Sequence, residues 1–225
     1  MCRYAETMIK GYLLVVCMCI VQLTSGQTAA PVAFQLSNMG YSAALTMGYA
    51  HFSPASITLN EENHRLSTRM YGGVKMGCYY AHALADKIYI VPQLNFHFQK
   101  LRLNYEIDGR IEYWQEIYPV TLEIPVHFNF VHQTNQQNIV TLFGAKWTYN
   151  MFPDELDSRM RLQNSFLSFD LGLGKSFLLK ETHILPFFIY SLGAENVFQY
   201  SDLPIHEQAF SQILMHQFSI HLRWN

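Results

Sequence analysis

The chain has 225 residues, of which 50% are apolar, 15% aromatic and only 14% charged, whereas an average soluble domain is about 25% charged. This composition excludes a disordered chain and is unusual for an ordinary water-exposed domain. The 15 Lys and Arg against 17 Asp and Glu give a net charge of −2, and no basic run offers a surface to DNA or RNA. We therefore expect no nucleic-acid binding.

Residues 1–26 have the features of a secretory signal peptide. Arg3 and Lys10 supply the positive charge, residues 12–23 are apolar, and the last three residues are small. The apolar stretch is shorter than the roughly 20 residues that a membrane-spanning helix needs. We therefore predict cleavage after residue 26 and a single mature domain over 27–225.

Apolar and polar residues alternate with a period of two through the mature chain, which predicts strands with two unlike faces. The predicted strands are residues 41–51, 69–81, 87–100, 117–131, 139–151, 166–179, 184–195 and 212–225. All eight are long enough for a tilted strand that crosses a membrane, which takes about 9 to 11 residues.

The connections between these strands alternate strictly between long and short. The long ones are residues 52–68, 101–116, 152–165 and 196–211, and the short ones are 82–86, 132–138 and 180–183. This alternation is typical of a transmembrane barrel, which has short periplasmic turns and long outer loops. Asp108-Gly109, flanked by alternating apolar residues, predicts a type I′ hairpin within the second long connection.

The mature chain has no apolar run of helix length, so it can cross a membrane only as a closed barrel. A water-soluble barrel would place the apolar faces inside. Small residues such as Gly144, Gly172 and Ser168 on the minor faces favour instead a narrow polar interior and an apolar outer surface. We predict an all-β fold, an eight-stranded antiparallel transmembrane β-barrel of the outer-membrane type, located in the cell outer membrane and in contact with its lipid.

The last predicted strand ends on Trp224, followed by Asn225. Outer-membrane barrels commonly end on an alternating strand with an aromatic residue at or near its end, which the barrel-assembly machinery recognises. The sequence therefore predicts this machinery as a partner, although any edge strand can end in Trp.

Six charged residues occupy the minor, inward faces: Lys75, Glu123, Lys146, Asp170, Glu195 and Arg223. If neighbouring strands pair symmetrically about their connections, Glu123, Lys146 and Asp170 lie side by side at mid-height, and Lys75 is a candidate fourth member. We interpret this set as a structural ion network that plugs the lumen, because an unpaired buried charge costs several kcal/mol. A gated ion path and a catalytic carboxylate pair remain as alternatives.

No cofactor, metal site or catalytic residue is predicted. His97, His127 and His221 share no ligand spacing on one strand, and Cys78 falls on an outward face. A second group near the first long connection has no diagnostic hydrolase spacing. Its members are His51, Ser53, Ser56, Glu61 and His64.

Three segments resemble the outer-membrane β-barrel family of Bacteroidetes that includes PorT-like proteins. They are Leu94 to Phe98, Val120 to Val126 and Leu142 to Lys146, and the most specific part is Leu-Glu-Ile-Pro over Leu122 to Pro125. The resemblance implies an eight-stranded outer-membrane barrel, one branch of which takes part in type IX protein secretion and gliding. It carries over no catalytic or ligand residues.

The first functional hypothesis is a small, closed, non-enzymatic barrel that acts as an accessory or interaction component, with protein partners in a secretion machine. The runner-up is an autonomous structural or adhesive barrel similar to OmpA. An outer-membrane hydrolase is the third alternative.

Overall fold

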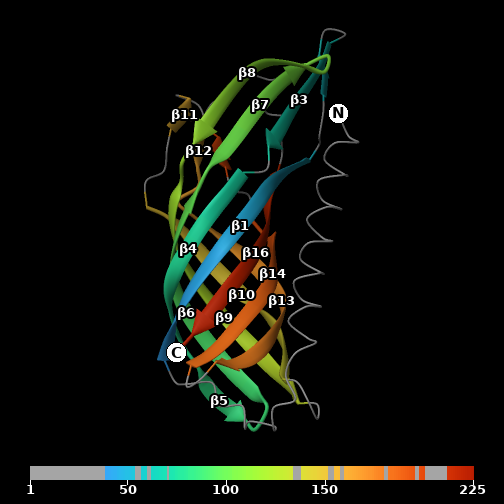
Figure 1. Cartoon of the computed structure of the whole chain (residues 1–225). Coiled ribbons are helices and arrows are strands. Elements are labelled where there is room, and N and C mark those ends of the chain that lie inside the picture. The colour runs from blue at the N-terminus through green and yellow to red at the C-terminus, as the bar shows by residue number, and fades with distance from the viewer. Residues whose placement is uncertain are drawn as a thin grey trace. The chain divides into compact units, whose positions relative to one another are not determined.

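Eight long strands pair side by side and close into a barrel in the computed structural model (Figure 1). The structure describes residues 39–53, 57–59, 62–69, 71–133, 138–151, 155–157, 160–179, 182–195, 198–200 and 212–225. The predicted leader, 1–26, lies outside this range. The barrel strands are β1 (Met39–Ser53), β4 (Tyr71–Tyr80), β6 (Ile88–Gln99), β9 (Val120–Gln133), β10 (Asn138–Asn150), β13 (Ser165–Leu179), β14 (Thr182–Gly193) and β16 (Gln212–Trp224).

Every neighbouring pair of barrel strands is antiparallel, and the order is β1, β16, β14, β13, β10, β9, β6, β4 and back to β1. Pairing of the first strand with the last leaves no open edge, so each spanning strand has hydrogen-bonded neighbours on both sides. The predicted fold class and all eight predicted strands are confirmed. A short strand, β5 (His82–Ala85), continues β4 beyond Ala81 and pairs with the beginning of β6.

Further strands extend the structure on the side of the long connections. One sheet contains β2 (Ile57–Leu59), β3 (Glu62–Arg69), β7 (Leu101–Ile107) and β8 (Arg110–Ile117). Another contains β11 (Glu155–Asp157), β12 (Met160–Leu162) and β15 (Phe198–Tyr200). Of these strands, only the pair β7 and β8 was predicted, as a hairpin; the segments that contain the others lack a long alternating pattern.

The turn between β7 and β8 has the predicted geometry. Asp108 has a φ of 47° and Gly109 a φ of 77°, and a type I′ turn needs positive φ at both central residues. The prediction that the second long connection continues its strands as a hairpin is therefore confirmed.

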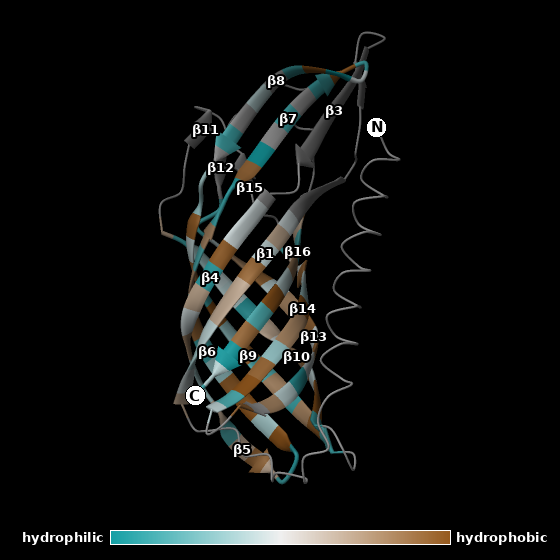
Figure 2. Ribbon diagram, viewed as in Figure 1, coloured by the Kyte–Doolittle hydropathy of each residue, from teal (hydrophilic) through white to brown (hydrophobic). Residues whose placement is uncertain are grey.

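The two faces of the barrel wall differ as predicted, with apolar side chains outward and mostly polar side chains inward. Along β6, Leu94, Phe96 and Phe98 are more than 40% exposed, whereas Asn95 and His97, between them, are each 1% exposed. Figure 2 shows the resulting alternation of hydrophobic and hydrophilic residues along the strands. A soluble barrel would have the opposite arrangement, so that alternative is wrong.

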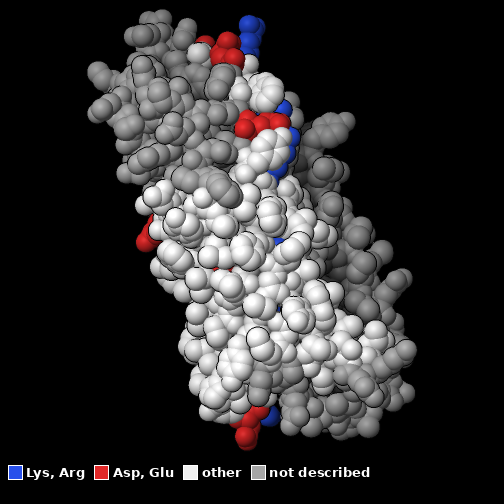
Figure 3. Space-filling model, turned by 90° about the vertical axis from the view of Figure 1, so that its left-hand side faces the viewer, with Lys and Arg blue, Asp and Glu red and all other residues white. Residues whose placement is uncertain are grey.

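Charged side chains on the face drawn in Figure 3 gather mainly towards its two ends, with a broad, almost uncharged surface between them. Such a surface suits lipid, because it offers apolar area and few charges to the hydrocarbon region. Among the described residues, no helix is long and apolar enough to cross a membrane.

Candidate functional site

An ion network fills the barrel interior at mid-height. The Lys75 ammonium lies 2.7 Å from Oε2 of Glu123, and Nδ1 of His97 lies 3.1 Å from Oε1 of the same carboxylate. Nζ of Lys146 lies 3.8 Å from Glu123 and 3.9 Å from Asp170. Each of these five side chains is at most 5% exposed, so the network is cut off from bulk water.

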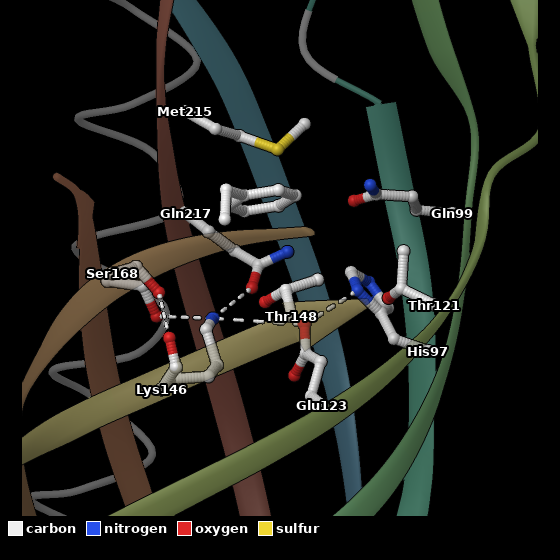
Figure 4. A pocket seen from close by; sticks show the side chains of 11 residues that line it. His97, Gln99, Thr121, Glu123, Lys146, Thr148, Ser168, Met215 and Gln217 are labelled. Atoms are coloured by element: carbon white, nitrogen blue, oxygen red, sulfur yellow. Dashed lines mark hydrogen bonds and ion pairs between the residues drawn. The ribbon is translucent and has the colours of Figure 1, made fainter. Parts of the chain in front are cut away.

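Neutral side chains complete the coordination of the two lysines. Lys75 donates a 2.7 Å hydrogen bond to Oε1 of Gln217, and Lys146 donates to the same oxygen at 3.3 Å and to Oγ of Ser191 at 3.1 Å. Oε1 of Gln217 therefore accepts from both ammonium groups, and Figure 4 shows the bond from Lys146. Because β16 is not adjacent to β4 or β10, these bonds cross the lumen.

His127 links the network to a buried arginine. Its Nδ1 lies 2.9 Å from Nη2 of Arg223 and 2.8 Å from Nε2 of Gln93, and its Nε2 lies 2.9 Å from Oδ2 of Asp170. A guanidinium can only donate, so Nδ1 of His127 accepts and the proton is on Nε2, which donates to Asp170. This pattern places a neutral imidazole between Arg223 and Asp170.

Arg223 is fully buried without a carboxylate partner among the described residues. Its guanidinium carbon lies 4.5 Å from the ring centroid of Phe187 and 5.8 Å from that of Tyr79. Nε and Nη1 of Arg223 have no hydrogen-bond partner in the structure. Two aromatic rings thus contact the guanidinium and contribute to the electrostatic compensation of this charge.

Apolar side chains close the lumen on the side of the short turns. We call this cluster the apolar plug, and it consists of Tyr79, Ala81, Tyr89, Val91, Val131, Val140, Leu142, Leu185, Phe187 and Ile189. Val91 and Val140 are completely buried. An eight-stranded barrel has an interior just wide enough for side chains, and here they fill it.

A small polar pocket lies over the network, lined among others by His97, Glu123, Lys146 and Gln217, with Met215 and Phe166 contributing its apolar part (Figure 4). It has room for roughly one water molecule. Within the described part of the chain, the network and the apolar plug fill the lumen at mid-height and on the side of the short turns.

The structure brings all four predicted network residues together, but with a different strand register. Lys146 lies opposite Pro125 and Ser168, each two residues away from the predicted partners Glu123 and Asp170. The strands are tilted, so residues at equal height are not register partners, and the long lysine side chain spans the offset.

Glu195 does not belong to the interior, and its assignment to an inward face is wrong. It is exposed, and its Oε2 accepts a 2.8 Å hydrogen bond from the backbone N–H of Leu167. The reason is that β14 ends at Gly193, so the alternation of faces does not continue to residue 195.

Several interior residues were not predicted to take part. His97 and His127 were considered only as metal ligands, although histidines on inward faces at the height of the carboxylates were candidates for hydrogen bonding. The apolar plug could also have been predicted from the sequence. Residues 88–91 and 184–189 are apolar on both faces of their strands, which indicates an apolar lumen near the short turns.

Within the described residues, no group of three or more side chains of the metal-binding types could hold a metal ion. The side chains of His51, Ser53 and His64 lie outside the described part of the structure, as do residues 56 and 61 altogether. The structure therefore gives no distances between these side chains, and the hydrolase alternative is not tested by it.

No protein-family model matches the sequence, and no curated protein sequence matches it. The outer membrane protein OprG from Pseudomonas aeruginosa aligns at 10% identity over 86% of this chain and 97% of that chain, with a TM-score of 0.46. The translocator domain of the autotransporter NalP from Neisseria meningitidis aligns at 8% identity over 98% of this chain and 96% of that chain, with a TM-score of 0.36.

The chain's own strand pairing and apolar outer surface establish the architecture of an outer-membrane β-barrel. The narrower resemblance to PorT-like proteins stays a prediction.

Proposed function

We propose that the chain is a closed, non-conducting outer-membrane barrel that acts as a non-enzymatic interaction component. The observation that supports the proposal is the contrast between the filled lumen and the sheets that extend beyond the barrel. In the described residues, an ion network and the apolar plug fill the lumen, which argues against transport of solutes through it. Beyond the barrel, strands continue into sheets that offer an ordered surface.

The hairpin formed by β7 and β8 is the best-defined part of this surface. It contains a type I′ turn at Asp108 and Gly109, and its partner β3 extends the pairing to a third strand. An ordered β-sheet presents side chains in fixed positions, which lowers the entropy lost on binding a partner. This favours recognition of a protein over a purely structural role in the membrane.

The resemblance of Leu122 to Pro125 and its neighbours to PorT-like barrels suggests that the partner belongs to a protein secretion machine. An autonomous adhesive barrel would use the same surface without a stable partner in its own membrane. A hydrolase would lose its function on replacement of His51 or His64, whereas the proposed role should survive these changes.

The test is site-specific photo-crosslinking in native outer membranes. A photo-reactive amino acid replaces Glu112, which is exposed on β8, or, as the control, Asp86, which is exposed in the turn between β5 and β6. The proposal predicts crosslinks to a second outer-membrane protein from position 112 and none to it from position 86. Absence of protein crosslinks at both positions would favour the autonomous barrel.

A further inference from the structure

An aromatic and cationic patch lies directly above the lipid-facing surface on the side of the long connections. The outward face of β6 continues from Phe98 to Lys100 and then to Arg102 in β7. The outward face of β9 is preceded by Trp114 in β8 and by Tyr118. Phe98, Trp114 and Tyr118 are 46%, 51% and 57% exposed, so the patch is continuous with the apolar surface below it.

The height of this patch matches the headgroup region of a bilayer. At about 3.3 Å per residue along a strand, Lys100 and Arg102 lie roughly 7 and 13 Å beyond Phe98, and the tilt of the strands reduces these distances along the barrel axis. The polar region of a bilayer is about 5 to 7 Å thick on each side. At a strand tilt of about 40° the two residues lie about 5 and 10 Å beyond Phe98 along the barrel axis, so Lys100 lies within the headgroup region. A long arginine side chain can span the distance from Arg102 to its outer edge.

The Arg102 guanidinium is held in place by two contacts, and the acidic residue nearest to it in the strand register is Glu116. Its carbon lies 4.3 Å from the ring centroid of Trp114, and its Nε donates a 3.0 Å hydrogen bond to Oδ1 of Asn104. These contacts fix the plane of the guanidinium. A planar pair of N–H donors matches two oxygens of a phosphate.

Lys100 neutralises the Glu116 carboxylate, which lies next to this guanidinium. Its Nζ lies 2.7 Å from Oε2 of Glu116, which also accepts a 2.9 Å hydrogen bond from the Tyr118 hydroxyl. The hydrogen bond from Lys100 holds the pKa of Glu116 below its ordinary value. With Glu116 opposite Arg102 in the strand register, the patch keeps one positive charge.

We propose that Arg102, with Lys100 and Trp114 beside it, binds the phosphate monoester of an anionic lipid in the membrane leaflet next to the long connections. The proposal commits to a lipid because the patch continues the lipid-facing surface and lies at headgroup height. It rests on the membrane placement proposed above and adds a specific ligand chemistry to it.

Trp114 itself can report the bound lipid. Replacement of Trp147 and Trp224 by Phe leaves Trp114 as the only tryptophan of the three. The protein is reconstituted in phosphatidylcholine vesicles that contain a small fraction of either brominated phosphatidic acid or brominated phosphatidylcholine. Bromine quenches tryptophan on contact, so the ratio of the two quenching efficiencies measures the preference for the phosphate monoester.

We expect about a fivefold preference for the phosphatidic acid, because one basic residue near a membrane surface strengthens the binding of an anionic lipid by about this factor. Arg102→Gln should abolish this preference, and Glu116→Gln, which keeps the stacking of Arg102 on Trp114, should increase it. Lys175→Gln is the matched control, because Lys175 is a partly exposed cation of β13, and it should leave the ratio unchanged. Excess inorganic phosphate should not compete.

Equal quenching by both lipids in the parent protein would overturn the proposal, as would a ratio that survives Arg102→Gln. Competition by inorganic phosphate would show a site for the free ion and would also overturn it. A second protein that keeps only Trp147, which is 42% exposed on the outer surface, tests the membrane placement separately. Brominated phosphatidylcholine should quench Trp147 whether or not the phosphate site exists.

Discussion

Lys75 and Glu123 form a 2.7 Å ion pair across the lumen, although their strands, β4 and β9, are separated by β6. His97 of β6 contacts the same carboxylate, so three consecutive barrel strands are tied together from the inside. Below this pair, the apolar plug fills the interior on the side of the short turns. Side chains thus fill the described barrel interior in place of a water-filled channel, and the following predictions test this packing.

Replacement of Lys146 by Met should destabilise the barrel by about 3 kcal/mol, because it removes a buried cation that faces two carboxylates. The midpoint of unfolding in guanidinium, followed by tryptophan fluorescence in lipid vesicles, measures the change. Lys175→Met provides the control, since this cation lies outside the lumen, with its Nζ 5.1 Å from the Phe177 ring centroid. Equal midpoints for Lys146→Met and the parent would contradict the network.

The sequence was sufficient for the eight barrel strands because each has two faces of opposite character, as in β6 and β9. The sequence did not predict the register partners of Lys146. In a tilted barrel, residues at equal height on neighbouring strands are not register partners, and the lengths of the connections do not give the size of this offset. The short strands of the long connections, such as β2 and β12, were missed because three residues are too few to show alternation.

Lys75 and Glu123 should also behave as an energetically coupled pair. Lys75→Met and Glu123→Gln are each expected to lower the free energy of unfolding. The double variant should lose less than the sum of the two single losses, by about 1 kcal/mol or more. Unfolding free energies of the four proteins in one lipid give this coupling. Strict additivity would mean that the 2.7 Å contact contributes no interaction energy.

Arg223 should tolerate an apolar replacement better than Lys146 does. Arg223→Met removes a fully buried charge that has no acidic partner among the described residues, and Nδ1 of His127 keeps its hydrogen bond to Gln93. We expect a loss of about 1 kcal/mol or less, or a small gain. A loss as large as that of Lys146→Met would show that Arg223 does more than the aromatic contacts with Phe187 and Tyr79 indicate.

Gly144 marks a point where β9 and β10 approach each other too closely for a side chain on Gly144. A Cβ at this position would collide with the Val126 carbonyl oxygen and come within 2.8 Å of the His127 ring. Gly144→Ala should therefore cost about 1 to 3 kcal/mol and disturb the bond between His127 and Asp170. Gly72→Ala is the matched change, because its Cβ would lie 3.7 Å from the Thr46 carbonyl oxygen and should be tolerated.

The most direct test of the closed barrel is the electrical conductance of the purified protein in planar lipid bilayers, recorded beside a general porin at the same protein concentration. We predict no discrete current steps from the parent protein, and none from Lys146→Met, because the apolar plug still fills the lumen below the network. Stable, reproducible current steps from the parent protein would contradict the account, since they require a continuous aqueous path through the interior.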